Sequence, residues 1–366
     1  MKNNDVIMLH GHESPRWLLE NAGPVIKYRV ANELAKEKNH KEIDSLRKAL
    51  LEDGLVRLWL NRLQPKFGRN DLHGTKTENY ENVMGKLYDF GLRKGMKALD
   101  DRTEPFLDWL AEQVKLPNVG YFPVLYRILA AAFLAMTGYS ENDAVKNCIV
   151  KRLETVYPFA KKADLSNVYI PQDSFRGFPR AFRNAPLINP EIYPNDEFKL
   201  PWIHDVNAFL HSPFIMEDAQ LRQKAETIIE FILKPEYQRL KPGYGTIRHE
   251  SGRYYAMGWS VQVPGFFDSG VDSRDFGRFL LLLSVLGRSQ KARRHEWFTR
   301  SVSLLESYRI DGGLYCFPRE FLPEKQTGPW VLGTRMGLEA NRRNNKAIVC
   351  ESTFRVLKIT SNQPKI

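Results

Sequence analysis

Three stretches near the carboxyl end decide the predicted fold: DGGLYCFP at 311–318, GPWVLG at 328–333 and ESTFRVLKI at 351–359. Glycine and proline interrupt the first two stretches, so each interruption predicts a tight turn. Tyr315 and Trp330 stand in these turns, where loops normally carry polar residues. Aromatic side chains in turns need either a shared core or a concave pocket. Aromatic residues in turns, followed by an apolar helix, form the pattern expected at the mouth of a helical ring.

Upstream of these stretches, the chain repeatedly shows apolar residues at helical spacing. Three apolar helices are expected to end at Gly91, Gly138 and Gly287, each followed by a polar stretch and an amphipathic helix. Gly91 and Gly138 are 47 residues apart, and Gly138 and Gly287 are 149 apart, close to three such periods. A period of roughly 50 residues built from helix pairs indicates a repeat architecture. Strand patterns are scarce, so we predict an all-α fold whose last helix is capped by Ser352 or Thr353.

The expected helices occupy eleven segments before the last one. They are 17–34, 43–51, 55–63, 80–90, 106–116, 121–137, 144–157, 206–211, 219–233, 276–286 and 294–308. Residues 1–65 read as a helical lead-in of the HEAT type, and residues 66–366 as the main unit. Within that unit, residues 158–201 contain seven prolines and no sustained period, so they predict a long excursion or a lid.

Composition places the chain among globular proteins, with 43% hydrophobic and 12% aromatic residues in 366. No apolar run approaches the roughly 18 residues that predict a transmembrane helix. The polar first residues lack the apolar region of a secretory signal. Three cysteines form no paired framework and suggest a reducing compartment, so we expect a cytoplasmic protein.

The chain is basic, with 54 Lys and Arg against 43 Asp and Glu and a net charge of +11. This charge fits an anionic ligand such as a phosphate or diphosphate, a nucleic acid, an anionic membrane surface, or a simple surface bias. Basic residues are spread along the chain without a Lys-rich tail, so nucleic acid is not the expected partner. Arg176, Arg180 and Arg183, which alternate with phenylalanines, fit either a phosphate or single-strand clamp or a solvated loop face.

The segments WLLEN at 17–21, KLYDFG at 86–91 and STFRVL at 352–357, together with the His73-Gly74 pair, form a recognisable pattern. It resembles the terpenoid cyclase and protein prenyltransferase toroid superfamily, in particular its small uncharacterised bacterial members. The resemblance implies a double ring of helices whose inner ring lines a central cavity. It carries no particular activity, because one fold hosts many functions.

The catalytic signatures of that superfamily are missing here. The D-x-D-D acid of class II cyclases has only the stretch 268–275 as a counterpart, with the wrong spacing, and residues 100–104 match D-D-x-x-D poorly. Asp311 and Cys316 resemble two of the prenyltransferase zinc ligands, but no histidine follows His295. We therefore expect no metal and no cofactor.

The acidic turn before the helix at 276–286 is the first candidate site. Asp272 and Asp275 fit a general acid and base at the rim of a cavity, where burial would raise a carboxyl pKa. Arg274 would then hold an anionic group. The alternative is structural, with Asp272 or Ser273 as an N-cap and the acids favoured by the helix dipole.

His73, in a polar loop with Asp71 and Glu78, fits a proton carrier, a weak metal ligand or a hydrogen-bonded surface group. The pairs at 204–205 and 249–250 are adjacent residues, which point apart in regular structure, so neither is a metal motif. Glu351 and Arg355 are expected to form an i,i+4 pair on the last helix. An aromatic set fits either the wall of a cavity or ordinary core: Tyr121, Trp202, Trp259, Tyr315, Phe317 and Trp330.

Three functions remain open from the sequence. The first is a toroid protein that binds a small, mostly apolar or ring-shaped ligand in a central cavity, with isoprenoid cyclisation or transfer as its chemistry. The second is a carbohydrate-active lyase, hydrolase or epimerase on the same fold. The third is a helical scaffold without enzymatic activity. The sequence leaves the oligomeric state open.

Overall fold

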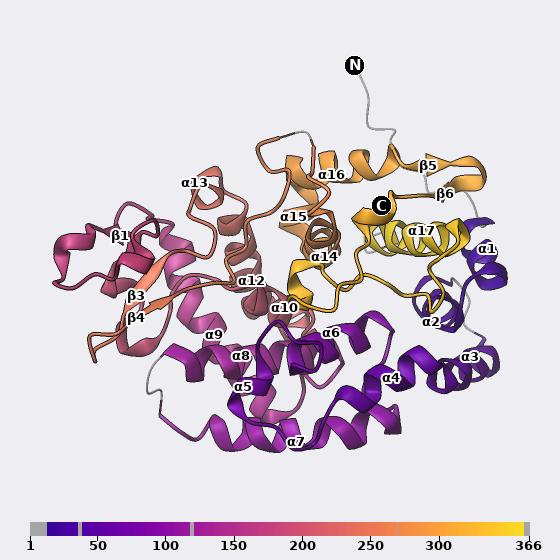
Figure 1. The fold of residues 1–366 in the computed structure, drawn as a ribbon, viewed down its shortest axis with the longest axis horizontal. Coiled ribbons are helices and arrows are strands. Elements are labelled where there is room, and N and C mark those ends of the chain that lie inside the picture. Colours follow the sequence, from indigo (N-terminus) through magenta and orange to yellow (C-terminus); the bar gives the residue numbers. More distant parts are fainter. Residues whose placement is uncertain (1–12, 36–38, 118–120, 269, 362–366) are drawn as a thin grey trace.

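The computed structural model describes residues 13–35, 39–117, 121–268 and 270–361, which are mostly helical (Figure 1). The α-helices are α1 (Glu13–Asn21), α2 (Pro24–Arg29), α3 (His40–Glu52), α4 (Gly54–Arg62), α5 (Arg69–Leu72), α6 (Tyr80–Asp89), α7 (Lys97–Gln113), α8 (Tyr121–Met136), α9 (Asp143–Lys162), α10 (Ile203–Leu210), α11 (Pro213–Glu217), α12 (Ala219–Ile232), α13 (Pro235–Gln238), α14 (Phe276–Leu286), α15 (Gln290–Arg294), α16 (Glu296–Glu306) and α17 (Asn345–Ser361). A π-helical turn, η1 (Val30–Leu34), follows α2. The predicted mostly helical character is confirmed.

A small sheet corrects the expectation of an all-α fold. Its strands are β1 (Tyr169–Ile170), β2 (Leu187–Ile188), β3 (Thr246–Arg248) and β4 (Tyr254–Ala256), in the order β1-β2-β3-β4. Only the β2–β3 pair is parallel. The sheet forms a lobe at one end of the molecule (Figure 1). The first residues of the predicted excursion, 158–162, belong to α9, which contains Pro158. In the rest, the prolines from 171 to 201 deny the chain helical hydrogen bonds, so it runs as short strands and 3-10 turns.

A second pair of strands, β5 (Arg309–Ile310) and β6 (Leu314–Tyr315), forms around the predicted Gly-Gly turn. The 3-10 turns are η2 (Gln172–Ser174), η3 (Arg180–Phe182), η4 (Pro190–Ile192), η5 (Pro194–Asp196), η6 (Asp311–Gly313), η7 (Arg319–Phe321) and η8 (Trp330–Leu332). Gly312 and Gly313 adopt φ of +72° and +71°, which explains why two glycines are needed there.

Five helices, α6, α8, α10, α14 and α17, are buried along most or all of their length. In chain order, each contacts the next: α6 with α8, α8 with α10, α10 with α14, and α14 with α17. Amphipathic helices alternate with them, since α7 and α9 pack on α8, and α12 packs on α9 and α10. The sequence pattern of apolar helices separated by amphipathic ones is therefore confirmed as buried helices separated by half-exposed ones.

The regular period of about 50 residues is wrong. Between Gly138 and α14, the described residues contain one buried helix, α10, where two were expected. The excursion and the sheet occupy the remaining length. Several helix boundaries also differ. The largest differences are that α7 begins at Lys97 and contains Pro105, because Leu99 and Phe106 are buried along its face, that α9 continues to Lys162, and that α17 begins at Asn345. Ser352 and Thr353 consequently lie inside α17, not at its start.

A loop enters the space between the buried helices. Trp330, at the start of η8, lies against Gly85 of α6 so closely that a Cβ atom at Gly85 would be 2.4 Å from the indole ring. On the opposite side, Gly277 of α14 leaves room for the backbone of Gly333, whose φ is +67°. Two glycines in buried helices therefore admit this loop.

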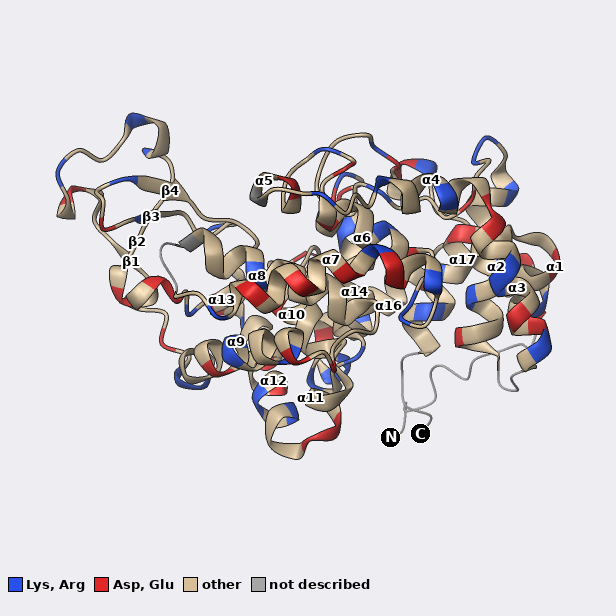
Figure 2. Cartoon of the chain, turned by 90° about the horizontal axis from the view of Figure 1, so that it is seen from below, with Lys and Arg blue, Asp and Glu red and all other residues tan. Residues whose placement is uncertain are grey.

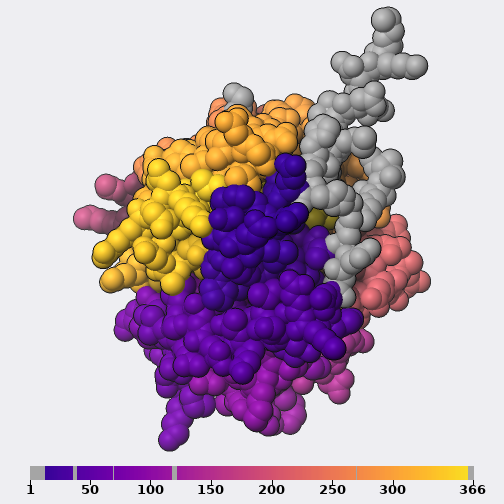
Figure 3. Space-filling model, turned by 90° about the vertical axis from the view of Figure 1, so that its right-hand side faces the viewer, coloured from indigo at the N-terminus to yellow at the C-terminus, as the bar shows by residue number. Residues whose placement is uncertain are grey.

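The amino-terminal helices pack against the carboxyl-terminal ones. Both α1 and α2 contact α17, and α4 contacts α6. Figure 3 shows these first helices lying beside the carboxyl-terminal segment on one side of the molecule. Acidic and basic residues are mixed along the helices (Figure 2). In the described part of the chain, no helix is both long and apolar enough to cross a bilayer.

Candidate functional site

Two polar clusters lie at opposite ends of α6 and α10. Near the amino ends, Glu81 Oε2 is 3.9 Å from His204 Nε2; near the carboxyl ends, the Tyr88 hydroxyl is 2.8 Å from His211 Nε2. The two helices therefore run in the same direction. Seven residues of α-helix separate the clusters by about 10 Å, at about 1.5 Å per residue. Phe133 and Trp330 lie between them, because Phe133 packs against both His204 and Trp330.

The amino-end cluster consists of His73, Glu81, His204 and Trp259, and we call it the Glu81 cluster. Glu81 has no exposed surface, and its Oε1 is 2.5 Å from His73 Nδ1 and accepts a hydrogen bond from the Gly74 amide at 2.8 Å. His73 keeps 27% of its side chain exposed. With Nδ1 directed at the carboxylate, Nε2 is the ring nitrogen left for a ligand.

The Glu81 carboxyl is ionised at neutral pH. Burial would raise its pKa, but the His204 and His73 rings outweigh that effect and hold the pKa below its ordinary value. A buried carboxylate is costly unless donors or positive charges lie beside it, and the two imidazoles and the Gly74 amide are the groups nearest to Glu81. One of these imidazoles, that of His73, is partly open to solvent.

His204 is an incomplete member of this network. It is entirely buried, and within the described residues neither of its ring nitrogens has a hydrogen-bond partner. Glu81 Oε2 is also unpartnered there. Buried polar atoms of this kind are rare in native proteins and call for an explanation. At 3.9 Å, the pair needs a shift of only about 1 Å to reach hydrogen-bond length.

The backbone of Trp259 is strained in this cluster. Its φ is +67°, in the left-handed region that non-glycine residues seldom adopt and that costs on the order of 1 kcal/mol or more. Its indole packs edge-on against both imidazoles, with ring centroids 4.7 Å from His73 and 5.4 Å from His204. Strain of this type persists where the surroundings demand it, and it is concentrated at functional sites.

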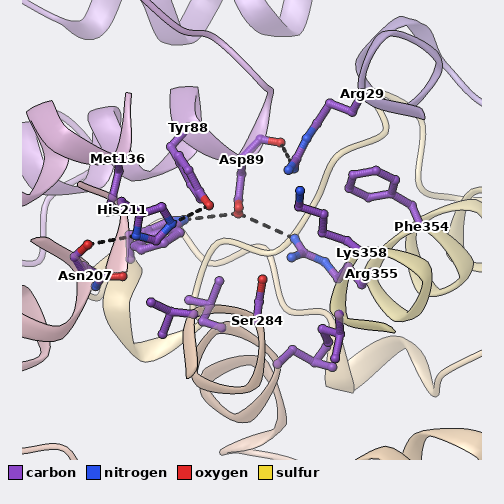
Figure 4. Close-up of a pocket in the computed structure, with 15 residues that line it drawn as sticks. Arg29, Tyr88, Asp89, Met136, Asn207, His211, Ser284, Phe354, Arg355 and Lys358 are labelled. Carbon is purple, nitrogen blue, oxygen red and sulfur yellow. Dashed lines mark hydrogen bonds and ion pairs between the residues drawn. The ribbon is translucent and has the colours of Figure 1, made fainter. Parts of the chain in front are cut away.

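The carboxyl-end cluster lines a pocket, which we call the basic pocket (Figure 4). Its lining comes from α2, α6, α8, α10, α14, η8 and α17, and it includes Arg29, Asp89, His211, Arg355 and Lys358. The pocket has a volume of about 40 Å³. One water needs about 10–15 Å³, so the pocket holds about three.

His211 is neutral in this pocket. Burial, followed by the charges of Arg288 and Arg93, lowers its pKa well below the ordinary value. Its Nδ1 lies 2.9 Å from the carbonyl oxygen of Asn207 and must donate to it. Nε2 therefore accepts from the Tyr88 hydroxyl at 2.8 Å. This tautomer leaves His211 without a free proton for an acid role.

The predicted acidic turn is exposed to solvent and does not line the basic pocket. Asp272, Arg274 and Asp275 are exposed and precede α14, whose N-cap is Asp275. Hydrogen bonds from Arg274, first from its side chain and then from its backbone, lower the pKa of Asp272 to about 2. The increase in pKa expected from burial is therefore wrong for Asp272, because solvent and the arginine stabilise its charge.

The predicted aromatic residues separate into different environments. Trp259 lies in the Glu81 cluster, and Trp330 lines the basic pocket. Trp202 is buried between the Phe198 ring, at 5.4 Å, and the Arg152 guanidinium, at 4.4 Å, which makes it a core residue. Tyr315 is buried near α17, and its hydroxyl donates to Glu306. The side chain of Tyr121 lies outside the described part of the structure.

His73 was predicted as a candidate in a loop with Asp71 and Glu78. Its carboxylate partner is Glu81, eight residues along, and not Asp71 or Glu78. The prediction that His204 and Asp205 point apart is confirmed, since Asp205 pairs with Arg152 whereas His204 lies towards Glu81. Glu81 carried little signal of its own, because Asn82, Lys86 and Asp89 are further polar residues in the same helix.

The expected pair of Glu351 with Arg355 is wrong. Glu351 pairs with Arg342 at 2.7 Å, whereas Arg355 points towards Asp89 at 3.6 Å. Both longer-range partners come from outside α17, so helical spacing gave no signal for them.

The described residues contain no group of three or more His, Cys, Asp and Glu side chains arranged to hold a metal ion. No protein family, no curated protein and no solved structure gives a significant match to this chain.

Proposed function

We propose that the buried helices close into a ring, so that the chain is an α/α toroid of the type that the sequence resembles. Two observations support closure. The successive contacts from α6 to α17 leave one gap, between α17 and α6, which the Arg355–Asp89 approach of 3.6 Å spans. The basic pocket is lined by all five of these helices, as the middle of a ring would be.

We further propose that the chain is an acid–base enzyme acting on a ring-shaped ligand at the Glu81 cluster. The observation that carries this proposal is the His73–Glu81 contact of 2.5 Å, which joins a partly exposed imidazole to a buried carboxylate. A carboxylate on Nδ1 fixes the tautomer and leaves the Nε2 lone pair available for a proton. His73 would then take or give a proton at Nε2, and Glu81 would stabilise the imidazolium.

The chemistry favours a carbohydrate over an isoprenoid ligand. An indole ring beside a general base suits a sugar ring, which offers a C–H face for stacking and hydroxyl or C–H groups for proton transfer. Lyases, hydrolases and epimerases all need proton transfer of this kind. The isoprenoid version assigned the acid to Asp272 and Asp275, which are exposed, and the pKa of Asp272 lies at about 2. A carboxyl with that pKa is deprotonated at neutral pH, so it holds no proton to donate to an alkene.

The test is a screen of neutral and uronic-acid oligosaccharides, with prenyl diphosphates as the competing class. Products would be read by chromatography and by mass change. We expect turnover of one carbohydrate class, with a loss of about 100-fold or more in His73→Asn, the scale of general acid–base catalysis. His40→Asn changes an exposed histidine at the start of α3 and serves as the matched control. Turnover of prenyl diphosphates alone, or full activity in His73→Asn, would refute the proposal.

A further inference from the structure

The basic pocket carries more positive than negative charge. Arg29, Arg355 and Lys358 line it, and the only carboxylate among its described lining residues is Asp89. A second carboxylate, Glu33, lies behind the lining and is engaged twice, by Arg29 at 2.8 Å and by Lys358 at 2.8 Å. Three cations thus face two carboxylates.

Two further cations act on the same pocket. Arg93 and Arg288 both lower the pKa of His211, which lines it. His211 is neutral and contributes no charge. Glu351 and Arg342 likewise act on Arg355, and their charges offset each other. Among the described residues, six cations and three carboxylates therefore leave an excess of three positive charges near the pocket.

One of these cations has an unused donor. Arg355 is buried, with 9% of its side chain exposed, and its Nη2 donates to the carbonyl oxygen of Met336. Its Nε has no hydrogen-bond partner among the described residues. Its approach to Asp89, at 3.6 Å, is longer than a hydrogen bond. A buried guanidinium donor without a partner is costly unless something else accepts from it.

Arginine capping of helix ends explains part of this charge but not all of it. Arg29 donates to the last carbonyl of α6, Arg93 to the carbonyl of Tyr88, and Arg288 to the last carbonyl of α10. Such contacts satisfy helix carboxyl ends, where cations are favoured. Arg355 and Lys358 lie on α17 and make no such contact with α6 or α10 in the described structure. Arg355 and Lys358 are therefore the two of these five cations whose positions helix capping does not explain.

We propose that the basic pocket binds a small oxyanion, a phosphate or a carboxylate, held by Arg355 and Lys358. The size of the pocket fits this ligand class, since about 40 Å³ accommodates a head group of a few atoms and not an isoprenoid chain. Guanidinium and ammonium groups are the usual donors to both kinds of oxyanion. This site lies across Phe133 and Trp330 from the Glu81 cluster and does not depend on the proposed enzymatic activity.

Isothermal titration of the full chain with inorganic phosphate, pyrophosphate, sulfate and acetate tests the proposal and separates the two ligand classes. We expect saturable binding of phosphate or acetate that weakens as salt concentration increases. Lys358→Met should weaken it by about tenfold or more, which is about 1.4 kcal/mol. Lys97→Met removes an exposed lysine that pairs with Asp101 and serves as the control, without effect on affinity.

A variant that is expected to tighten anion binding distinguishes the loss of a binding residue from a damaged fold. Asp89→Asn removes the carboxylate that competes for Arg355, so it should tighten anion binding by several-fold, whereas a damaged fold would weaken it. Arg355→Met should abolish binding. No saturable binding of any of the four anions would overturn the proposal, as would unchanged affinity in both Lys358→Met and Arg355→Met.

Discussion

Replacing Gly85 by alanine tests the central packing of the fold. Gly85 is in the interior of α6, where alanine would ordinarily stabilise a helix by about 1 kcal/mol. Here the added Cβ would lie 2.4 Å from two atoms of the Trp330 ring and 2.9 Å from a third. Carbon atoms in contact sit about 3.5–4.0 Å apart, so the indole must move by more than about 1 Å.

Trp330 has little room for that movement, because both of its nitrogens are engaged. Its amide donates to Asn82 at 2.7 Å, and its indole nitrogen donates to Asp89 at 3.2 Å. Overpacking a core costs about 1–3 kcal/mol, and losing a buried hydrogen bond adds about 1–3 kcal/mol. Subtracting the gain of about 1 kcal/mol in helix propensity leaves a net destabilisation of about 1–5 kcal/mol.

Equilibrium urea unfolding measures this quantity as a lower midpoint at an unchanged slope. Gly54→Ala is the matched control, because Gly54 opens α4 and a Cβ there would meet nothing within 4 Å. In a Trp330→Leu background the clash is relieved, so Gly85→Ala should become neutral or stabilising. Equal stability of Gly85→Ala and the unmodified chain would refute the insertion of the η8 loop between α6 and α14.

Three further outcomes are expected. Arg152→Met should lower the free energy of unfolding in urea by about 3–5 kcal/mol, because it leaves the Asp205 carboxylate buried without its cation. Lys151→Met, in the exposed Lys151–Glu197 pair, should lower it by less than about 1 kcal/mol. The pKa of Glu81 lies below its ordinary value of 4.5, so the contribution of its carboxylate to the free energy of unfolding is complete above pH 4.5 and is lost as the pH falls further. The difference in unfolding free energy between the unmodified chain and Glu81→Gln should therefore narrow below pH 4.5. A constant difference would contradict the ionised state. Burial raises the pKa of the Cys148 and Cys350 thiols to about 12. A thiol reagent at pH 8 should therefore label the half-buried Cys316 before either of them. Equal labelling rates of the three thiols in the folded protein would contradict this.

The sequence predicted the apolar helices well because their signal is local. The helix expected at 80–90 is α6, the one at 121–137 is α8, and the one at 276–286 is α14, each within one residue of its predicted end. Hydrophobic runs of this length, stopped by glycine, leave little choice of structure. The boundaries of α7 and α17 were missed because tertiary burial there overrides proline and capping preferences.

The candidate site could be predicted only in part, because its members are far apart in the sequence. His73 and Trp259 were selected individually, but nothing local joins residue 73 to residue 204, or Asp89 to Arg355. These contacts depend on the relative rotation of buried helices, which a single sequence does not specify. The burial predicted for Asp272 and Asp275 is wrong for a related reason: three charged residues in one turn are more readily accommodated at the surface than inside a cavity.

The distribution of charge between the two ends of the helices follows from their common direction. Parallel helices place several positive dipole ends together at one side and several negative ends at the other. At the amino ends of α6 and α10 the chain holds the buried carboxylates Glu81 and Asp205. At their carboxyl ends it supplies Arg29 and Arg288 to the last carbonyls. An acid–base cluster and a basic pocket about 10 Å apart are therefore two consequences of one arrangement. If α6 and α10 were antiparallel, each end would mix both kinds of charge, and neither proposed site would have its present electrostatic character.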